Sequence, residues 1–257
     1  MKKRKMVFLC ILTVLAFLIN SVYALATPGE KSWFCIRNGN LQPPLSAEEM
    51  LINEYGAISI DRSVSDSSEK KVIYITFDCG YENGNVERIL DTLREEKITA
   101  AFFLLDNIII KNTDLVTRMA DEGHLVCNHT KNHKNLCKES FEAIKNDISA
   151  LEDIYREYTG KEMEKFFRFP EGRYSESALE SVEKLGYKSV FWSFAYEDWN
   201  DNAQPNPDKA ISKILNNTHN GAIILLHPTS KVNADILPTL IKEWRHMGYE
   251  FGSLCDI

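Results

Sequence analysis

The sequence predicts an α/β fold in which parallel strands close into a barrel, and three observations support this prediction. Short apolar runs of strand length alternate with segments of helical spacing along most of the 257 residues, as in parallel sheets with right-handed crossovers. Polar side chains able to do chemistry follow several of these runs, where barrel enzymes gather their active sites. No glycine-rich phosphate loop follows the first run, which disfavours the alternative of a doubly wound nucleotide-binding sheet.

Each predicted strand is a short run rich in β-branched and aromatic residues. The first, 72–77, is continuous in such residues, as strands buried on both faces are. The later strands are expected at 99–105, 124–128, 166–168, 188–193, 222–227 and 251–254. About seven strands alternating with helices fit a (β/α) barrel.

The segments between these strands have helical periodicity. In 86–96, apolar side chains recur at intervals of three and four residues and form one face. Gly123 is a natural C-cap for a helix over 114–122, and Ser175 is the N-cap of a helix that ends at Gly186. Further helices are expected at 47–55, 141–158, 208–216 and 233–247.

The first 26 residues have the pattern of a secretory signal peptide. Four basic residues precede an apolar stretch over 6–19, and Ala24-Leu25-Ala26 offers small residues to a signal peptidase. That stretch is shorter than the roughly 20 residues that span a bilayer. We therefore expect cleavage after Ala26, and not a retained anchor, and hence a secreted protein without a stable membrane span.

Cleavage would leave an acidic chain. It removes four basic and no acidic residues, which takes the formal charge from −7 to −11. Such a charge argues against nucleic acid as a partner. The remaining length suits an N-terminal leader segment, 27–70, and one large α/β domain, 71–257, which we expect to be monomeric.

Five cysteines follow the signal peptide, so at least one is unpaired. Cys35 and Cys255 lie near the two ends of the mature chain, and chain ends often lie close together. A disulfide between them is one alternative, and free buried thiols throughout are the other.

The most informative segment is His129-Thr130-Lys131-Asn132-His133, which follows the apolar run 124–128. Two histidines four residues apart on a helical turn would share one face, as a metal-binding pair requires. Asp78, at the end of a separate predicted strand, would supply a base or a further ligand. The alternative is that the histidines are ordinary surface residues.

Together these residues would support metal-assisted hydrolysis. A metal held by two histidines would polarise a substrate carbonyl and lower the pKa of water, and Asp78 would accept the proton of that water. Arg168 would hold the carboxylate of Asp78 by charge-assisted hydrogen bonds. His227 would protonate the leaving nitrogen, and Asp198 would keep His227 charged.

Each residue also has a purely structural interpretation. Arg168 could be an ion-pair partner and His227 a core histidine, while Asp198 with Trp199 could cap a loop. The aromatic cluster of Trp199, Tyr196 and Trp192 could be core and not a sugar platform. The appearance of all these residues in order at strand ends favours the catalytic interpretation.

From about Val72 to the C-terminus, the chain resembles the polysaccharide deacetylases of carbohydrate esterase family 4, which have NodB homology. The five motifs of that family appear in order: Thr76-Phe77-Asp78-Cys79-Gly80, His129-Thr130-Lys131-Asn132-His133, Arg168-Phe169-Pro170-Glu171-Gly172, Asp198-Trp199, and Leu225-Leu226-His227-Pro228. The resemblance implies a distorted (β/α)7 TIM-like barrel that removes acetyl groups from an aminosugar polymer.

The resemblance also implies roles for single residues. By position, Asp78 is the base, Arg168 positions it, and His227 is the acid that Asp198 tunes. His129 and His133 are the metal ligands. The backbone N–H of Glu171 would help to hold the oxyanion, and Trp199 and Leu225 would line the groove and the acetyl pocket.

Further residues resemble the delta-lactam-biosynthetic de-N-acetylases. These are Tyr81-Glu82-Asn83-Gly84, Phe191-Trp192-Ser193 and Asp198-Trp199-Asn200, so Tyr81 is expected to contact substrate. That subgroup acts on N-acetylmuramic acid in spore-cortex peptidoglycan, before muramic δ-lactam forms. The within-family alternative is an N-acetylglucosamine deacetylase acting on peptidoglycan or a chitin-like chain.

Three residues depart from the family pattern. Phe169 and Glu171 replace residues that are frequent there, which affects the expected subsite contacts, and Cys79 affects the expected metal site. Cys79 stands where the family usually has a second, metal-binding aspartate. A thiolate with two imidazoles would form a His-His-Cys site selective for Zn²⁺. Alternatively, the thiol stays protonated and two histidines with water hold the metal. A third alternative is a wall-glycan binding protein that has lost activity through this change.

Overall fold

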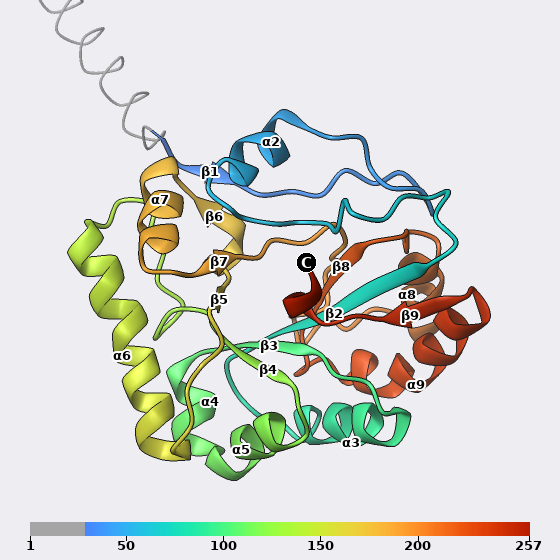
Figure 1. Ribbon diagram of the computed structural model, residues 1–257. Coiled ribbons are helices and arrows are strands. Elements are labelled where there is room, and N and C mark those ends of the chain that lie inside the picture. The colour runs from blue at the N-terminus through green and yellow to red at the C-terminus, as the bar shows by residue number, and fades with distance from the viewer. Residues whose placement is uncertain (1–28) are drawn as a thin grey trace, which may run out of the picture.

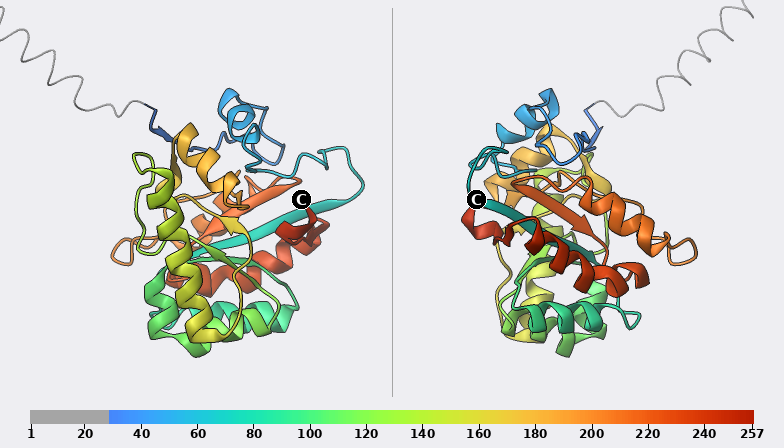
Figure 2. Two further views of the ribbon diagram at one scale, coloured as in Figure 1. Left: turned by 60° about the vertical axis from the view of Figure 1, so that its left-hand side comes forward. Right: turned by 90° about the vertical axis from the view of Figure 1, so that its right-hand side faces the viewer.

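Parallel strands curl around a common axis, and helices cover their outer face (Figures 1 and 2). The structure is a computed structural model that describes residues 29–257, so the expected signal peptide lies outside the described residues. The strand order is β7-β5-β4-β3-β2-β8, with β9 also paired to β2. The strands are β2 (Lys71–Cys79), β3 (Ala101–Leu104), β4 (Leu125–Asn128), β5 (Phe166–Phe167), β7 (Lys188–Ser189), β8 (Ala222–Leu226) and β9 (Tyr249–Phe251). All of these pairings are parallel, and the predicted distorted (β/α)7 barrel is confirmed.

The helices surround the sheet (Figure 1). They are α2 (Ala47–Asn53), α3 (Val86–Glu96), α4 (Asp106–Lys111), α5 (Thr113–Asp121), α6 (Phe141–Thr159), α7 (Glu176–Lys184), α8 (Pro207–Leu215) and α9 (Lys231–His246). Helix α2 lies between α7 and α8 (Figure 1). Ser175 caps α7 as predicted, because its side chain accepts from the backbone of Ala178. Short elements complete the chain: antiparallel β1 (Lys31–Ser32) and β6 (Arg173–Tyr174), and 3-10 turns η1 (Pro170–Gly172) and η2 (Leu254–Asp256). Helix α4 has no counterpart in the sequence analysis, since its three consecutive isoleucines lack helical periodicity.

The leader segment closes the barrel between β7 and β8. Ile58 forms a parallel bridge to Val190, and Ile60 an antiparallel bridge to Ala222. The backbone N–H of Asp61 donates to Gly221 O at 2.9 Å, and a Cβ at Gly221 would lie 2.2 Å from Asp61 O. Glycine is therefore required at Gly221, and residues 58–61 complete the ring of strands.

The strand predicted over 188–193 is shorter than expected, because the chain leaves β7 after Ser189. Ser193 N–H donates to Ile223 O at 3.0 Å, and Phe194 bridges Ile224. This segment therefore joins β8 on the side opposite β2 and carries the following loop over the barrel opening.

Side-chain alternation along β2 separates two cores. Ile73, Ile75, Phe77 and Cys79 pack in the core between the sheet and helices such as α3 and α9. Val72 and Tyr74 face the barrel interior, where Leu254 of η2 packs against them. Because strand side chains alternate, Thr76 and Asp78 share the inner face, which sets the position of the site.

The described residues contain neither a disulfide nor a membrane-spanning helix. The five cysteines of this part of the chain are free thiols, so the Cys35–Cys255 disulfide does not form. Among residues 29–257, no helix combines the length and the apolar character needed to cross a bilayer.

Candidate active site

Four strand ends bring the predicted polar residues to one rim of the barrel. Asp78 is the penultimate residue of β2, and His129, Arg168 and His227 directly follow β4, β5 and β8. Because the strands are parallel, their carboxyl ends meet at the same end of the barrel, where barrel active sites form.

Arg168 is the structural centre of this group. Its guanidinium is fully buried and donates to Asp78 Oδ1 at 2.8 Å, Thr76 Oγ1 at 2.9 Å and Val190 O at 3.0 Å. The Cζ atom lies 4.0 Å from the ring centroid of Phe103. Burial alone would raise the pKa of Asp78, but the charge and the hydrogen bond of Arg168 keep it below its usual range. Asp78 is therefore an ionised carboxylate in a fixed orientation.

His129 has the environment of a metal ligand. Its Nδ1 lies 2.8 Å from Arg168 O, so Nδ1–H donates to that carbonyl and Nε2 keeps its lone pair. Nε2 is 3.5 Å from Asp78 Oδ2. Burial lowers the pKa of His129 to about 4, so the ring is neutral, as metal binding requires.

His133 reaches the site from a loop, and the predicted helical turn is wrong. Residues 129–133 are non-helical, and Thr130 and His133 have φ values of 68° and 61°. The rings of His129 and His133 nevertheless lie 5.1 Å apart between centroids, nearly perpendicular. A tight left-handed bend thus brings the two imidazoles together, as a helix would have done.

Local hydrogen bonds hold this bend in place. Thr130 N–H donates to Asn128 Oδ1 at 2.9 Å, and Thr130 Oγ1 accepts from Lys134 N–H at 3.1 Å. Lys131 N–H donates to Asp147 Oδ1 of α6 at 3.0 Å. These bonds satisfy the backbone where the chain departs from regular structure.

Cys79 lies on the opposite face of β2 from Asp78. Its side chain is buried in the core beneath the helices, and Sγ contacts Tyr81 O at 3.8 Å. Burial raises the pKa of the thiol well above its ordinary value. Among the described residues, no group of three or more His, Cys, Asp or Glu side chains is arranged to hold a metal. The surroundings of Cys79 thus favour the protonated thiol of our two alternatives.

The two imidazoles fit a divalent metal without Cys79. His129 presents an unprotonated Nε2 towards Asp78, with its tautomer fixed by a backbone carbonyl. Asp78 Oδ2 lies beside that nitrogen. Water or substrate oxygen would fill the remaining coordination positions, as in catalytic sites with open positions.

His227 and Asp198 form a second dyad across the opening. His227 Nδ1 donates to Asp198 Oδ1 at 2.7 Å, and His227 N–H donates to Asp198 Oδ2 at 2.9 Å. Asn233 Nδ2 donates to the same Oδ2 at 2.6 Å, and Asn233 Oδ1 accepts from the hydroxyl of Tyr196. The Tyr196 bond fixes which end of the amide faces Asp198, and the carboxylate is fully buried yet well paired.

We expect Asp198→Asn to move the alkaline limit of activity to lower pH. Burial and the charge of Arg168 lower the pKa of His227. The hydrogen bond and charge of Asp198, together with the charge of Asp78, outweigh them and raise this pKa above 6.5. A general acid must be protonated, so activity is lost as pH rises through this pKa. Without the carboxylate, the pKa of His227 loses its main raising cause, so the limit should move to lower pH.

The measurement is the pH profile of kcat/KM, with the surface change Asp121→Asn as the control. If the alkaline limb of the profile were unchanged in Asp198→Asn, His227 would not be the general acid.

The raised pKa of His227 also makes the stability of the fold depend on pH. Protonated His227 contributes its full stabilisation of the fold below pH 6.5, the pKa of an ordinary histidine. That contribution is lost as pH rises through the higher pKa that His227 has in the folded protein.

Leu225 and Trp199, the predicted substrate-lining residues, lie near His227. Leu225 is 4% exposed and pairs with Thr76 across the β2–β8 ladder, two residues before Asp78 on the same face of β2. Trp199 is 56% exposed, and its ring meets the His227 ring edge-on at 5.8 Å. An apolar wall and an open aromatic surface thus flank the dyad.

Tyr81 and Glu171 lie on loops at the same rim. The Tyr81 hydroxyl donates to Asp201 at 2.8 Å, which ties the loop after β2 to the loop after Trp199. Glu171 has a φ of 56°, and its exposed carboxylate pairs with Arg173 at 3.0 Å. Their contacts with substrate, and the oxyanion role of the Glu171 N–H, remain predictions.

Two positioning residues have no counterpart in the sequence analysis. Asn233 orients Asp198, and its sequence signal is a capping pattern, because Ser230 Oγ accepts from Asn233 N–H at the start of α9. Gln204 donates to the backbone oxygens of Asp198 and Asn200 and accepts from Ser230 Oγ, which fixes the loop that carries Trp199. Both act over long sequence distances, which a local pattern does not reveal.

Comparisons with known proteins agree with this geometry. A family model described as polysaccharide deacetylase matches residues 65–190. The chain is 34% identical to peptidoglycan-N-acetylmuramic acid deacetylase PdaA of Bacillus subtilis, over 98% of this chain and 96% of that protein. A solved structure of B. subtilis PdaA, titled a family 4 carbohydrate esterase, aligns with a TM-score of 0.83 at 33% identity, over 90% of this chain and 97% of that one. A peptidoglycan-N-acetylglucosamine deacetylase of Bacillus cereus is 29% identical, over 74% of this chain and 89% of that protein.

Proposed function

Because this chain belongs to the polysaccharide deacetylases of carbohydrate esterase family 4, which are metal-dependent hydrolases of amide C–N bonds, we propose that it deacetylates N-acetylmuramic acid in peptidoglycan. The reaction would hydrolyse the acetamide to acetate and a free amine. The observation that carries the proposal is the pairing of an oriented carboxylate, Asp78, with an imidazole that is hydrogen-bonded to Asp198, His227, on one rim. The length and identity of the match to a muramic acid deacetylase support the choice of sugar.

Each catalytic residue would have one task. Asp78, ionised and held by Arg168, accepts a proton from water while the water oxygen forms a bond to the acetyl carbon. The backbone N–H of Glu171 would donate to the oxygen that gains charge. His227 then donates its proton to the sugar nitrogen as the C–N bond breaks, and Asp198 stabilises the charged ring.

A divalent metal bound by His129 and His133 would polarise the acetyl carbonyl and lower the pKa of the attacking water. We propose Zn²⁺, because imidazole nitrogens suit it and catalytic zinc sites keep open positions. In this proposal Cys79 is a core thiol.

We expect Cys79→Ala to leave the Zn²⁺ dissociation constant within about twofold of wild type, because the thiol lies on the far face of β2. His133→Ala should weaken Zn²⁺ binding by at least about tenfold, since it removes one of the two nitrogen donors. Calorimetric titration of the metal-free protein measures both. A large loss of affinity in Cys79→Ala would instead establish the His-His-Cys site.

Acetate release tests the proposed activity. Purified protein with Zn²⁺ should release acetate from muramyl glycan, and the mass of the product should fall by one acetyl group per muramic acid. Loss of acetyl groups from glucosamine alone would favour the N-acetylglucosamine deacetylase. No acetate with any divalent metal would favour the inactive glycan-binding protein.

We further propose that the protein acts outside the cytoplasm, in the cell wall or spore envelope, as a monomer that loses its signal peptide, residues 1–26. The wall polymers named for its relatives lie there, and the basic and apolar pattern of the first 26 residues fits export. If muramic acid is the substrate, we propose that the protein contributes to formation of the muramic δ-lactam in spore cortex. Reduced muramic δ-lactam in cortex digests of a strain lacking this chain would support that role.

A further inference from the structure

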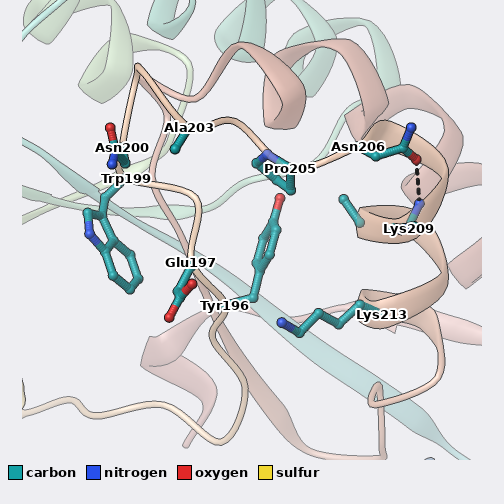
Figure 3. A pocket seen from close by; sticks show the side chains of 10 residues that line it. Tyr196, Glu197, Trp199, Asn200, Ala203, Pro205, Asn206, Lys209 and Lys213 are labelled. Atoms are coloured by element: carbon teal, nitrogen blue, oxygen red, sulfur yellow. Dashed lines mark hydrogen bonds between the residues drawn. The ribbon is translucent and has the colours of Figure 1, made fainter.

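A cavity of about 630 Å³ lies beside the active-site rim, between the loop that carries Trp199 and helix α8. Tyr196 lies in its middle, Trp199 on one side, and Lys209 and Lys213 on the other (Figure 3). The catalytic steps above leave this cavity unused.

The cavity is connected to the catalytic acid through two aromatic residues. The ring of Trp199 lines the cavity and also meets the ring of His227 at 5.8 Å. Tyr196 lines it too, and its hydroxyl donates to Asn233, which in turn holds Asp198. A saccharide in this cavity would therefore belong to the same strand as the sugar at His227.

The charges of the lining favour an acidic ligand. Lys209 and Lys213 are one helical turn apart on α8 and both line the cavity, and the Lys213 side chain extends towards Tyr196 (Figure 3). Glu197 is the single acidic residue of the lining. Within residues 29–257, neither ammonium group forms an ion pair, although the whole chain has a formal charge of −7. Two unpaired cations beside aromatic rings suit a sugar that bears a carboxylate.

We propose that this cavity binds a carboxylate-bearing saccharide unit two positions along the strand from the muramic acid being deacetylated, because muramic acid alternates with neutral N-acetylglucosamine in peptidoglycan. The proposal rests on the proposed function and deepens it, because it makes the enzyme selective for acidic glycan over neutral glycan. The carboxylate could be the free lactyl group of a stem-free muramic acid or a carboxylate of the stem peptide. Both present the same anionic group to the two lysines.

The test compares Lys209→Gln/Lys213→Gln with wild type on three glycans: stem-free muramyl tetrasaccharide, stem-bearing muramyl tetrasaccharide and neutral chitotetraose. We expect the ratio of kcat/KM for acidic over neutral glycan to fall roughly three- to tenfold, the range for two exposed charges. A loss confined to the stem-free or the stem-bearing glycan identifies the source of the carboxylate. Salt should reduce the ratio of wild type towards that of the variant.

The matched control is Lys145→Gln/Lys242→Gln, which removes the same charge from exposed positions on α6 and α9 that do not line the cavity. Its ratio should equal that of wild type. An equal fall in control and test variants, or none in the test variant, would overturn the cavity proposal.

A binding measurement separates this proposal from the proposed activity. In an Asp78→Asn background that does not turn over substrate, calorimetry gives the dissociation constant for stem-free and stem-bearing tetrasaccharides with and without the two lysines. Weaker binding without them supports the cavity site even if wild type released no acetate, which would overturn only the proposed function. Equal binding with and without the lysines overturns the cavity site alone.

Discussion

Asp78→Asn should reduce kcat for acetate release by about 10³-fold, within the range for loss of a general base. The amide has nearly the same shape, and its oxygen can still accept from Arg168, which lies 2.8 Å from Asp78 Oδ1. It cannot accept a proton from water, however, because an amide is not a base near neutral pH. The measurement is initial-rate acetate release from muramyl glycan with saturating Zn²⁺.

Asp235→Asn is the control for this prediction, since it neutralises a carboxylate on the surface of α9 that pairs with Arg88 and Lys231. Its rate should match wild type within about twofold, and circular dichroism should show both variants folded. Asp78→Asn activity above a tenth of wild type would show that another group accepts the proton.

Arg168→Met should destabilise the fold by roughly 3 kcal/mol or more, the cost of leaving one partner of a buried ion pair unpaired. Arg168 is fully buried and the Asp78 side chain is 11% exposed, so water gives the carboxylate little compensation. Met keeps an apolar chain against Phe103, which isolates the loss of the charge. Urea denaturation measures the free energy of unfolding.

The double variant Asp78→Asn/Arg168→Met completes the cycle. Because no unpaired carboxylate remains, it should be more stable than Arg168→Met, with a coupling energy on the order of 1–3 kcal/mol. Additive effects of the two single changes would mean that the ion pair, for all its short distances, does not couple the two residues energetically.

The sequence alone predicts the barrel and part of the site, because both depend on local pattern and strand direction. Helices α3 and α6 begin and end within a residue of their predicted bounds, because apolar spacing defines both and Ser140 and Gly160 cap α6. Asp78, Arg168 and His227 could be placed together because parallel strands put their carboxyl ends on one rim. These features depend on local pattern and on strand direction alone.

The other features depend on contacts that local sequence does not specify. His133 approaches His129 through a left-handed bend fixed by Asn128 and Thr130 and not through helical spacing. Cys79 follows Asp78 directly, so motif position suggested a shared site, whereas strand alternation turns its thiol into the core. Asn233 belongs to the site through bonds to residues far along the chain.

The bridges from Ile58 and Ile60 to Val190 and Ala222 have a practical consequence. A shortened protein beginning at Lys71, where the regular repeat starts, would leave the backbone groups of Ser189, Phe191 and Gly221 without their leader partners at the edge of the resulting gap. Exposed strand edges recruit other chains, so such a fragment should self-associate when expressed. Full-length protein, or one shortened no further than residue 29, should be preferred for crystallisation and for every assay above.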